Sequence, residues 1–198
     1  MRFGVKKYLL VPNGVNPSKL NRDLKPFDLP RSKEITIGFF GYITNAWFDW
    51  DVLLELARKH KEWIFHIIWW GEDWPKGIPN NIISLGPIPH EDLPHYSANW
   101  DIGLLNFKNT YLVKCSCPIK VYEYLWLGLP VVSIDIPYLR NYPYVYTCNN
   151  INDFEKNIVL AKRQKFNRHL VDNFLQNYTW NHHFHTILSN IEQGDAIE

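Results

Sequence analysis

Cysteine and long apolar runs are scarce in this sequence of 198 residues. Its three cysteines, Cys115, Cys117 and Cys148, are odd in number and too few for a disulfide framework in a chain of this length. The most apolar stretch, residues 63–70, is interrupted by His66 and is far shorter than the roughly 20 residues of a membrane-spanning helix. The first residues also lack the apolar segment of a secretory signal. We therefore expect a cytoplasmic protein that does not span a bilayer.

An excess of charge of one sign is missing as well. The chain has 21 Lys and Arg against 20 Asp and Glu, which gives a net charge of +1. Because such a balance creates no field that attracts nucleic acid, we expect no nucleic-acid partner. A local basic stretch, residues 162–168, is typical of a solvated helix face, and peripheral contact with the inner face of a membrane is the alternative.

Common cofactor and metal motifs are absent from the sequence. It contains neither Gly-x-Gly-x-x-Gly nor the P-loop pattern, so a dehydrogenase or an ATPase has no fingerprint here. Cys115 and Cys117 have the wrong spacing for a zinc pair. The histidines at 182, 183 and 185 are interpreted as a polar helix face rather than as metal ligands. We expect no metal and no cofactor.

Apolar residues are plentiful and follow a regular alternation of strand and helix patterns. They make up 46% of a chain that can hold one large domain or a domain with an appendage, but not two catalytic domains. Runs rich in β-branched and aromatic residues predict six strands, and helical periodicity separates several of them. The predicted strands span residues 35–43, 64–70, 82–85, 101–107, 131–134 and 144–148, and the helices span 47–60, 91–100, 118–127 and 152–162.

This alternation predicts an α/β fold with a Rossmann-like, doubly wound parallel sheet of six strands in the order 3-2-1-4-5-6. Residues 34–163 would form this domain. Residues 1–33 resemble a linker with a short strand at residues 8–11, and residues 164–198 contain two further helices, at 166–178 and 180–191.

The strand order predicts where a ligand would bind. In such a sheet the crevice lies outside the carboxyl ends of the first and fourth strands, and the first strand ends at Gly41 and Tyr42. The fourth strand leads through residues 108–117 into a helix opened by Pro118, a residue favoured in a first helical turn. We therefore expect the amino end of this helix to face the crevice.

Two charged residues on that helix suit a nucleotide. Lys120 adds a full positive charge to a helix terminus that already favours anions, so a phosphate fits there. Glu123, three residues on, shares its face and can accept hydrogen bonds from the hydroxyls of a ribose. The alternative is an ordinary core helix with an ion pair between Lys120 and Glu123 on its surface.

Four stretches of the chain match a known pattern. Residues 8–15 read Tyr-Leu-Leu-Val-Pro-Asn-Gly-Val, and residues 80–96 combine a strand, a glycine turn and a helix. Residues 117–133 contain Pro-Ile-Lys-Val-Tyr-Glu-Tyr followed by Gly-Leu-Pro-Val-Val, and Trp180 opens the last helical pattern. Together they resemble the nucleotide-sugar-binding C-terminal half of GT-B fold glycosyltransferases of the group 1 type.

The resemblance implies roles for some residues and leaves gaps at others. Glu123 matches the second glutamate of the family's Glu-x7-Glu motif, which is implied to hold the ribose, and Lys120 lies where a basic residue meets the diphosphate. The first glutamate is replaced by Cys115. No cation follows the first strand, where the family commonly has an arginine and a lysine, so the diphosphate would depend on Lys120, on Lys108 or Lys114, and on backbone amides.

The implied reaction is transfer of a hexose from a nucleoside diphosphate sugar to an acceptor hydroxyl, without a required metal, in surface polysaccharide biosynthesis. The implied partners are that donor and an acceptor-binding domain or partner chain; without the latter we expect the chain to be inactive. The last helix would then expose Phe184, Ile187, Leu188 and Ile191. The alternatives are a non-catalytic nucleotide-binding module of the same fold and a nucleotide-sugar epimerase on that fold. No catalytic residue is assigned from the sequence.

Overall fold

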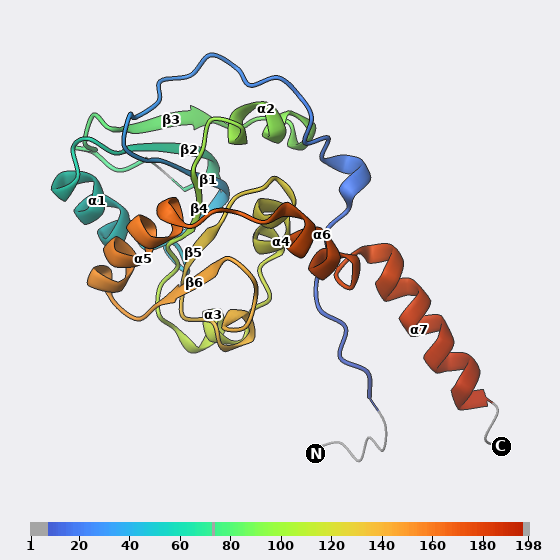
Figure 1. Ribbon diagram of the computed structural model, residues 1–198. Coiled ribbons are helices and arrows are strands. Elements are labelled where there is room, and N and C mark those ends of the chain that lie inside the picture. The colour runs from blue at the N-terminus through green and yellow to red at the C-terminus, as the bar shows by residue number, and fades with distance from the viewer. Residues whose placement is uncertain (1–7, 73, 196–198) are drawn as a thin grey trace.

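The computed structural model describes residues 8–72 and 74–195, and in them a parallel sheet of six strands forms the centre (Figure 1). The strands lie in the order β3-β2-β1-β4-β5-β6. All neighbours run parallel, which confirms the predicted fold class and strand order. The strand bounds are Thr36–Ile43 for β1, Ile64–Gly71 for β2, Ile82–Gly86 for β3, Ile102–Leu105 for β4, Val131–Ile134 for β5 and Val145–Cys148 for β6.

Helices connect the strands and cover the sheet. Right-handed crossovers on either side of the β1/β4 pair direct the helices to opposite faces. Accordingly α1 contacts α5, and α4 contacts α6. The helix bounds are Trp50–Lys59 for α1, Leu93–Ser97 for α2, Tyr111–Lys114 for α3, Ile119–Trp126 for α4, Ile151–Arg163 for α5, Arg168–Gln176 for α6 and Trp180–Asp195 for α7, with short 3-10 helices η1 at Pro17–Lys19, η2 at His90–Asp92 and η3 at Pro137–Leu139.

Two expectations about local structure were wrong. Residues 8–11 form no strand; the first pairing of this segment is an isolated bridge between Val15 and Thr179. The expected strand 101–107 ends at Leu105, and Phe107 instead forms an antiparallel bridge with Phe48. Extended apolar residues become a strand only where a neighbouring strand accepts their backbone hydrogen bonds.

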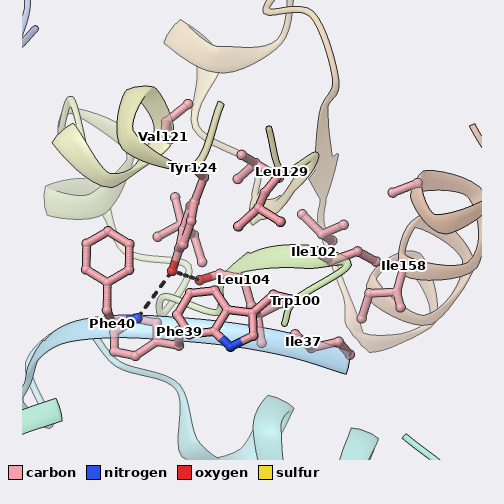
Figure 2. Close-up of a cluster of buried hydrophobic side chains, with 14 of the residues drawn as sticks. Ile37, Phe39, Phe40, Trp100, Ile102, Leu104, Val121, Tyr124, Leu129 and Ile158 are labelled. Carbon is pink, nitrogen blue, oxygen red and sulfur yellow. Dashed lines mark hydrogen bonds between the residues drawn. The ribbon is translucent and has the colours of Figure 1, made fainter. Parts of the chain in front are cut away.

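Two glycines let large aromatic rings lie directly on the middle of the sheet (Figure 2). A Cβ atom on Gly38 would lie 1.9 Å from the Trp100 ring, and one on Gly103 would lie 2.4 Å from the Tyr124 ring. The Tyr124 hydroxyl accepts a hydrogen bond from the Phe40 amide at 3.3 Å. This contact fixes the middle of α4 over β1 and β4, the strands that flank the expected crevice.

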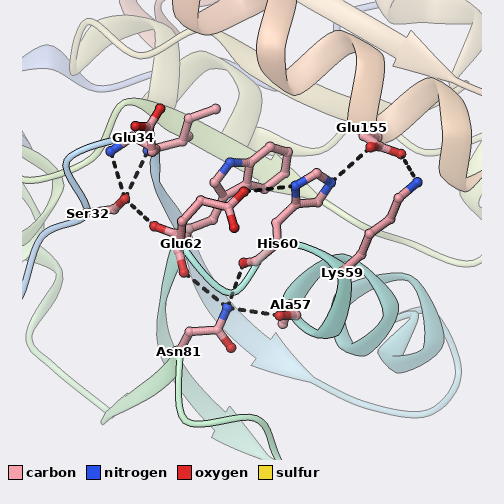
Figure 3. Close-up of polar contacts among 10 residues, drawn as sticks. Ser32, Glu34, Ala57, Lys59, His60, Glu62, Asn81 and Glu155 are labelled. Atoms are coloured by element: carbon pink, nitrogen blue, oxygen red, sulfur yellow. Dashed lines mark hydrogen bonds and ion pairs between the residues drawn. The ribbon is translucent and has the colours of Figure 1, made fainter.

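At the opposite end of the sheet, polar contacts bind the strands to α1 and α5 (Figure 3). The Asn81 side-chain amide donates to the carbonyl groups of Ala57, His60 and Trp63, each at 3.0 Å. His60 also contacts Glu155 of α5 at 3.0 Å. These contacts stabilise the amino ends of β2 and β3, at the edge of the sheet opposite the expected crevice.

The segment before the sheet packs against α4 and α6. Val15 and Leu20 are buried. Arg22 donates two hydrogen bonds to Asp172 at 2.7 and 2.8 Å, which holds the pKa of that carboxyl below its usual range. The guanidinium also lies 3.8 Å from the centre of the Trp126 ring. The domain limits at residues 33/34 and 163/164 remain predictions.

Helix α7 extends away from the rest of the structure (Figure 1). Phe184, Leu188 and Ile191 are 63%, 56% and 55% exposed, as expected, whereas Ile187 is half-buried. His182 and His185 are exposed, as expected for a polar helix face, whereas His183 is buried and its ring nitrogen lies 3.4 Å from the Asn13 carbonyl. None of the described helices is both long enough and apolar enough to cross a membrane.

Candidate functional site

Two adjoining pockets lie at the carboxyl ends of the central strands, where the crevice was predicted. The first, here the β2 pocket, has a volume of about 290 Å³, and the second, the β4 pocket, has about 340 Å³. Tyr42, Ile119 and Lys120 line both. The β2 pocket is completed by Phe40, Gly41, Ile68, Trp70, Ile88, His90, Leu93 and Glu123, and the β4 pocket by Asn13, Trp47, Phe107, Leu112, Val113, Ser116, Cys117 and Pro118.

The structure therefore brings all the predicted site residues together. Gly41, Tyr42, Lys120 and Glu123 meet in the β2 pocket, and Pro118 lines the β4 pocket beside them. A larger surface hollow of about 790 Å³ lies between α1 and the amino ends of β2 and β3. Ligands of this fold bind at the carboxyl ends of the strands, so the two adjoining pockets are the better candidate.

Lys120 lines both pockets, and its side chain packs closely against the end of β1. Gly41 has a backbone φ of +137°, and a Cβ atom there would lie 2.2 Å from Lys120 Cε. Lys120 Nζ lies 5.9 Å from the centre of the Phe39 ring, and burial lowers the pKa of this amine. Lys120 Nζ donates no hydrogen bond to any of the residues that the structure describes. Its N–H donors are therefore available to an anion in either pocket.

The amino end of α4 adds to the positive electrostatic potential around Lys120. Pro118 occupies the N-cap position and no side chain caps the terminus. Asn13 donates a hydrogen bond to the Cys117 carbonyl at 2.5 Å, which fixes the residue just before the helix. An uncapped helix start with a lysine in its first turn favours a negatively charged group.

Glu123 lies one turn deeper, on the wall of the β2 pocket. Its side chain is 8% exposed, and its Oε1 atom accepts a hydrogen bond from His90 Nε2 at 2.7 Å. Within the described residues, this carboxylate is paired with His90 and not with Lys120. The alternative of a surface ion pair between Lys120 and Glu123 is therefore wrong, because Glu123 is nearly buried and its ionic partner is His90.

His90 is the residue of this site that sequence reasoning missed. It opens η2, in the turn that follows β3, and lines the β2 pocket. Its hydrogen bond to Glu123 raises the pKa of the imidazole, although partial burial opposes the shift. The only sequence signal was its position within residues 80–96, since nothing in local spacing links it to a glutamate 33 residues away.

The other candidate cations do not line the pockets. Lys108 Nζ donates to the Asn45 carbonyl at 2.6 Å, and Lys114 is exposed outside both linings. Cys115 is also exposed and belongs to neither lining. The described residues contain no group of three or more His, Cys, Asp or Glu side chains that could hold a metal ion.

Taken together, the sheet order and the pockets at its β1/β4 switch point define a doubly wound α/β domain with a candidate ligand site at the carboxyl edge of the sheet. The chain belongs to the glycosyl transferase-like family, whose family model matches residues 51–189. It is 30% identical over 157 residues to a protein of Bacillus subtilis (strain 168) that carries the name teichuronic acid biosynthesis glycosyltransferase TuaH. That match covers 72% of this chain and 38% of the relative.

Solved structures share the fold. The lipopolysaccharide outer core galactosyltransferase WaaB, in its apo form, superposes with a TM-score of 0.66 at 22% identity, over 92% of this chain and 54% of that one. The Staphylococcus aureus protein TarM gives a TM-score of 0.60 at 18% identity, over 95% and 40% of the two chains. The chain thus spans about half or less of the length of these relatives. The predicted resemblance to one half of a GT-B glycosyltransferase is confirmed.

Proposed function

We propose that this chain binds a nucleoside diphosphate sugar across its two pockets and acts as the donor half of a glycosyltransferase. The reaction is transfer of a hexose to an acceptor hydroxyl during surface polysaccharide biosynthesis. The family assignment and the name of the Bacillus subtilis relative support the reaction class and the process. The TarM structure is a complex with UDP, which supports a nucleoside diphosphate as the ligand type.

One observation carries this proposal: Lys120 separates a pocket that contains Glu123 from a pocket that does not. A nucleotide sugar has the linear order base, ribose, diphosphate and sugar. With the ribose on Glu123 and the diphosphate on Lys120, the nucleoside occupies the β2 pocket and the sugar extends into the β4 pocket. The order ribose, diphosphate and sugar in the ligand then matches the order Glu123, Lys120 and β4 pocket in the protein.

The same arrangement suits the chemistry of transfer. When the bond between the sugar and the diphosphate breaks, negative charge grows on the departing phosphate oxygen. Lys120 and the uncapped start of α4 are placed to stabilise that charge, which is the type of contact that lowers a barrier. We propose that no metal is needed for this step. The acceptor, whose hydroxyl receives the sugar, and the groups that activate this hydroxyl would be held by another domain or partner chain.

A non-catalytic nucleotide-binding module is the second candidate. It is favoured by the β4 pocket, whose described lining residues include neither Asp nor Glu, and by Cys115, which replaces the family's first glutamate and lies outside both pockets. A domain that only binds nucleotide needs no carboxylate next to the sugar.

A thermal-shift panel of UDP, GDP and ADP, each with and without an attached hexose, tests the proposed ligand class. A ligand at about a hundred times its dissociation constant stabilises the folded state by roughly 2.7 kcal/mol, so one nucleotide series should raise the melting temperature clearly. No shift with any member would contradict donor binding. Transfer in the presence of a supplied acceptor half then separates the enzyme from the non-catalytic module.

A further inference from the structure

The carboxylate of Glu123 has its partner on a different element. Its Oε1 atom is 2.7 Å from His90 Nε2, and this hydrogen bond joins α4 to the turn after β3. Glu123 is 8% exposed, whereas the His90 side chain is 48% exposed. Both side chains line the β2 pocket. A nearly buried acceptor is thus held by a donor that remains open to the ligand space.

The backbone around His90 is well fixed. Pro89 precedes it, and the Asp92 amide donates to the Pro89 carbonyl at 3.1 Å. The Leu93 amide donates to the His90 carbonyl, and the Leu93 side chain is buried in the core. These contacts fix the backbone of His90 beside the pocket, at the place from which its ring reaches Glu123.

The charges near the imidazole come from several elements. Glu123 and Glu91 both raise the pKa of His90. Among the described residues, Lys120 on α4 and Tyr42 on β1 are the other titratable side chains that line the same pocket. A positive charge on His90 therefore adds to that of Lys120 at the place proposed for the nucleotide.

We propose that His90 is a positioning residue for nucleotide recognition: it holds Glu123 in the orientation that accepts hydrogen bonds from a ribose. This inference rests on the proposed function. Glu123 Oε2 has no hydrogen-bond partner within the described residues, so one carboxylate oxygen is held by His90 and the other is open to the ligand. Without His90, Glu123 Oε1 would lose its hydrogen-bond donor. The side chain would then turn toward solvent, because a nearly buried charge without a partner is costly.

The opposite role makes the opposite prediction. If His90 only occupied an oxygen that the ribose needs, removing it would strengthen binding. If it positions Glu123, removing it weakens binding, because the ligand must then order the carboxylate itself. The sign of the change therefore separates the two roles.

The test compares four forms of the chain by calorimetry with UDP, GDP and ADP: wild type, His90→Ala, His90→Gln and His182→Ala. For whichever diphosphate binds the wild type, we expect His90→Ala to weaken binding about tenfold or more, which corresponds to about 1.4 kcal/mol. His90→Gln keeps an N–H donor and should stay within about threefold of wild type at pH 8. His182 is exposed on α7, so its replacement should change nothing.

A pH series separates positioning from general structural support. Only the wild type gains a charge on residue 90 as the pH falls, while protonation of the ligand is common to wild type and His90→Gln. The advantage of wild type over His90→Gln should therefore grow from pH 8 to pH 5.5. In the free protein, nuclear magnetic resonance titration of His90 should show a lower pKa in Glu123→Gln than in wild type.

The results of these measurements test the positioning role of His90 and the proposed function separately. Unchanged or tighter binding by a folded His90→Ala overturns the positioning role, and so does an advantage over His90→Gln that is the same at all pH values. If wild type binds none of the three diphosphates, the proposed function fails and the ribose role fails with it. The titration of free His90 would still show whether the pair with Glu123 exists, so the two failures are distinguishable.

Discussion

Glu123 combines two properties: its side chain is nearly buried, and it keeps one oxygen free of protein partners in the described structure. Buried carboxylates are normally fully paired, because removing charge from water is costly. A free oxygen on a buried carboxylate is available for a ligand hydroxyl. At the residue scale, the donor proposal depends on this group and on Lys120.

Glu123→Ala should weaken nucleotide binding and remove preference for ribose. Hydrogen bonds to a charged group contribute roughly 1.5–3 kcal/mol each, so the loss in affinity should be at least about tenfold, with Glu123→Gln milder. Calorimetry with a nucleoside diphosphate and its 2′-deoxy analogue checks this. Wild type should favour the ribose form, and Glu123→Ala should bind both equally. Unchanged affinity in both variants would disprove the ribose role.

Lys120→Ala should reduce affinity for a nucleoside diphosphate much more than for the nucleoside. The diphosphate carries the charge that the amine contacts, whereas the nucleoside lies toward Glu123, so a loss of about tenfold or more is expected only for the former. The measurement is calorimetry with both ligands. Equal losses for the two would mean that Lys120 supports α4 and does not touch phosphate.

At the scale of elements, the close approach of β1 and α4 depends on Gly41. Its positive φ and the 2.2 Å approach of Lys120 Cε to a virtual Cβ leave no room for a side chain. Gly77 offers a matched control, because it has a φ of +72° with nothing within 4 Å of a Cβ. A side chain at either position would strain the backbone, but only at Gly41 would it also contact a residue of the candidate site, Lys120.

Gly41→Ala and Gly77→Ala should both lower stability, by about 1 kcal/mol or more, because alanine disfavours positive φ. Only Gly41→Ala should also weaken nucleotide binding, since Lys120 must move away from the end of β1. Urea unfolding and calorimetry on both variants check the two effects separately. Equal nucleotide affinity in Gly41→Ala and wild type would show that the position of Lys120 is not set by this contact.

The elements that could be predicted from sequence are those with a strong repeating pattern. Apolar runs bounded by turn residues identified every strand of the sheet, and their alternation with helices gave the strand order and so the place of Lys120 and Glu123. The four-residue helix α3 was missed, because it is too short to show periodicity. His90 was missed because its contact with Glu123 is long-range and depends on how η2 and α4 meet.

At the scale of the whole molecule, apolar side chains are exposed near both ends of the described chain. Phe184, Leu188 and Ile191 form one exposed side of α7, which stands away from the domain (Figure 1). Tyr8 and Leu10 are also exposed, at the other end of the described chain. Apolar surface of this kind is expected to be covered by another domain, copy or partner. The chain spans 38% of its Bacillus subtilis relative, so there is ample length in such proteins for a covering domain.

The 198-residue chain on its own is therefore expected to bind a donor but not to transfer sugar. Without an acceptor-binding half, the two substrates are not held in reacting geometry, and water reaches the pockets. Orientation alone can supply roughly 7–11 kcal/mol of a rate enhancement, so its loss lowers the rate by many orders of magnitude. Mixing the chain with a GT-B acceptor half and a labelled nucleotide sugar measures whether transfer returns.

The exposed side of α7 should be needed for that recovery. Replacing Phe184 and Leu188 together by serine should leave nucleotide affinity unchanged, because both residues lie outside the two pockets, but should prevent the acceptor half from restoring transfer. The control is His182→Ala on the same helix, which should not interfere. Transfer by the purified chain alone at about 1 per second or faster, within the ordinary range of enzymes, would contradict the prediction and show that the chain completes its site without a second half.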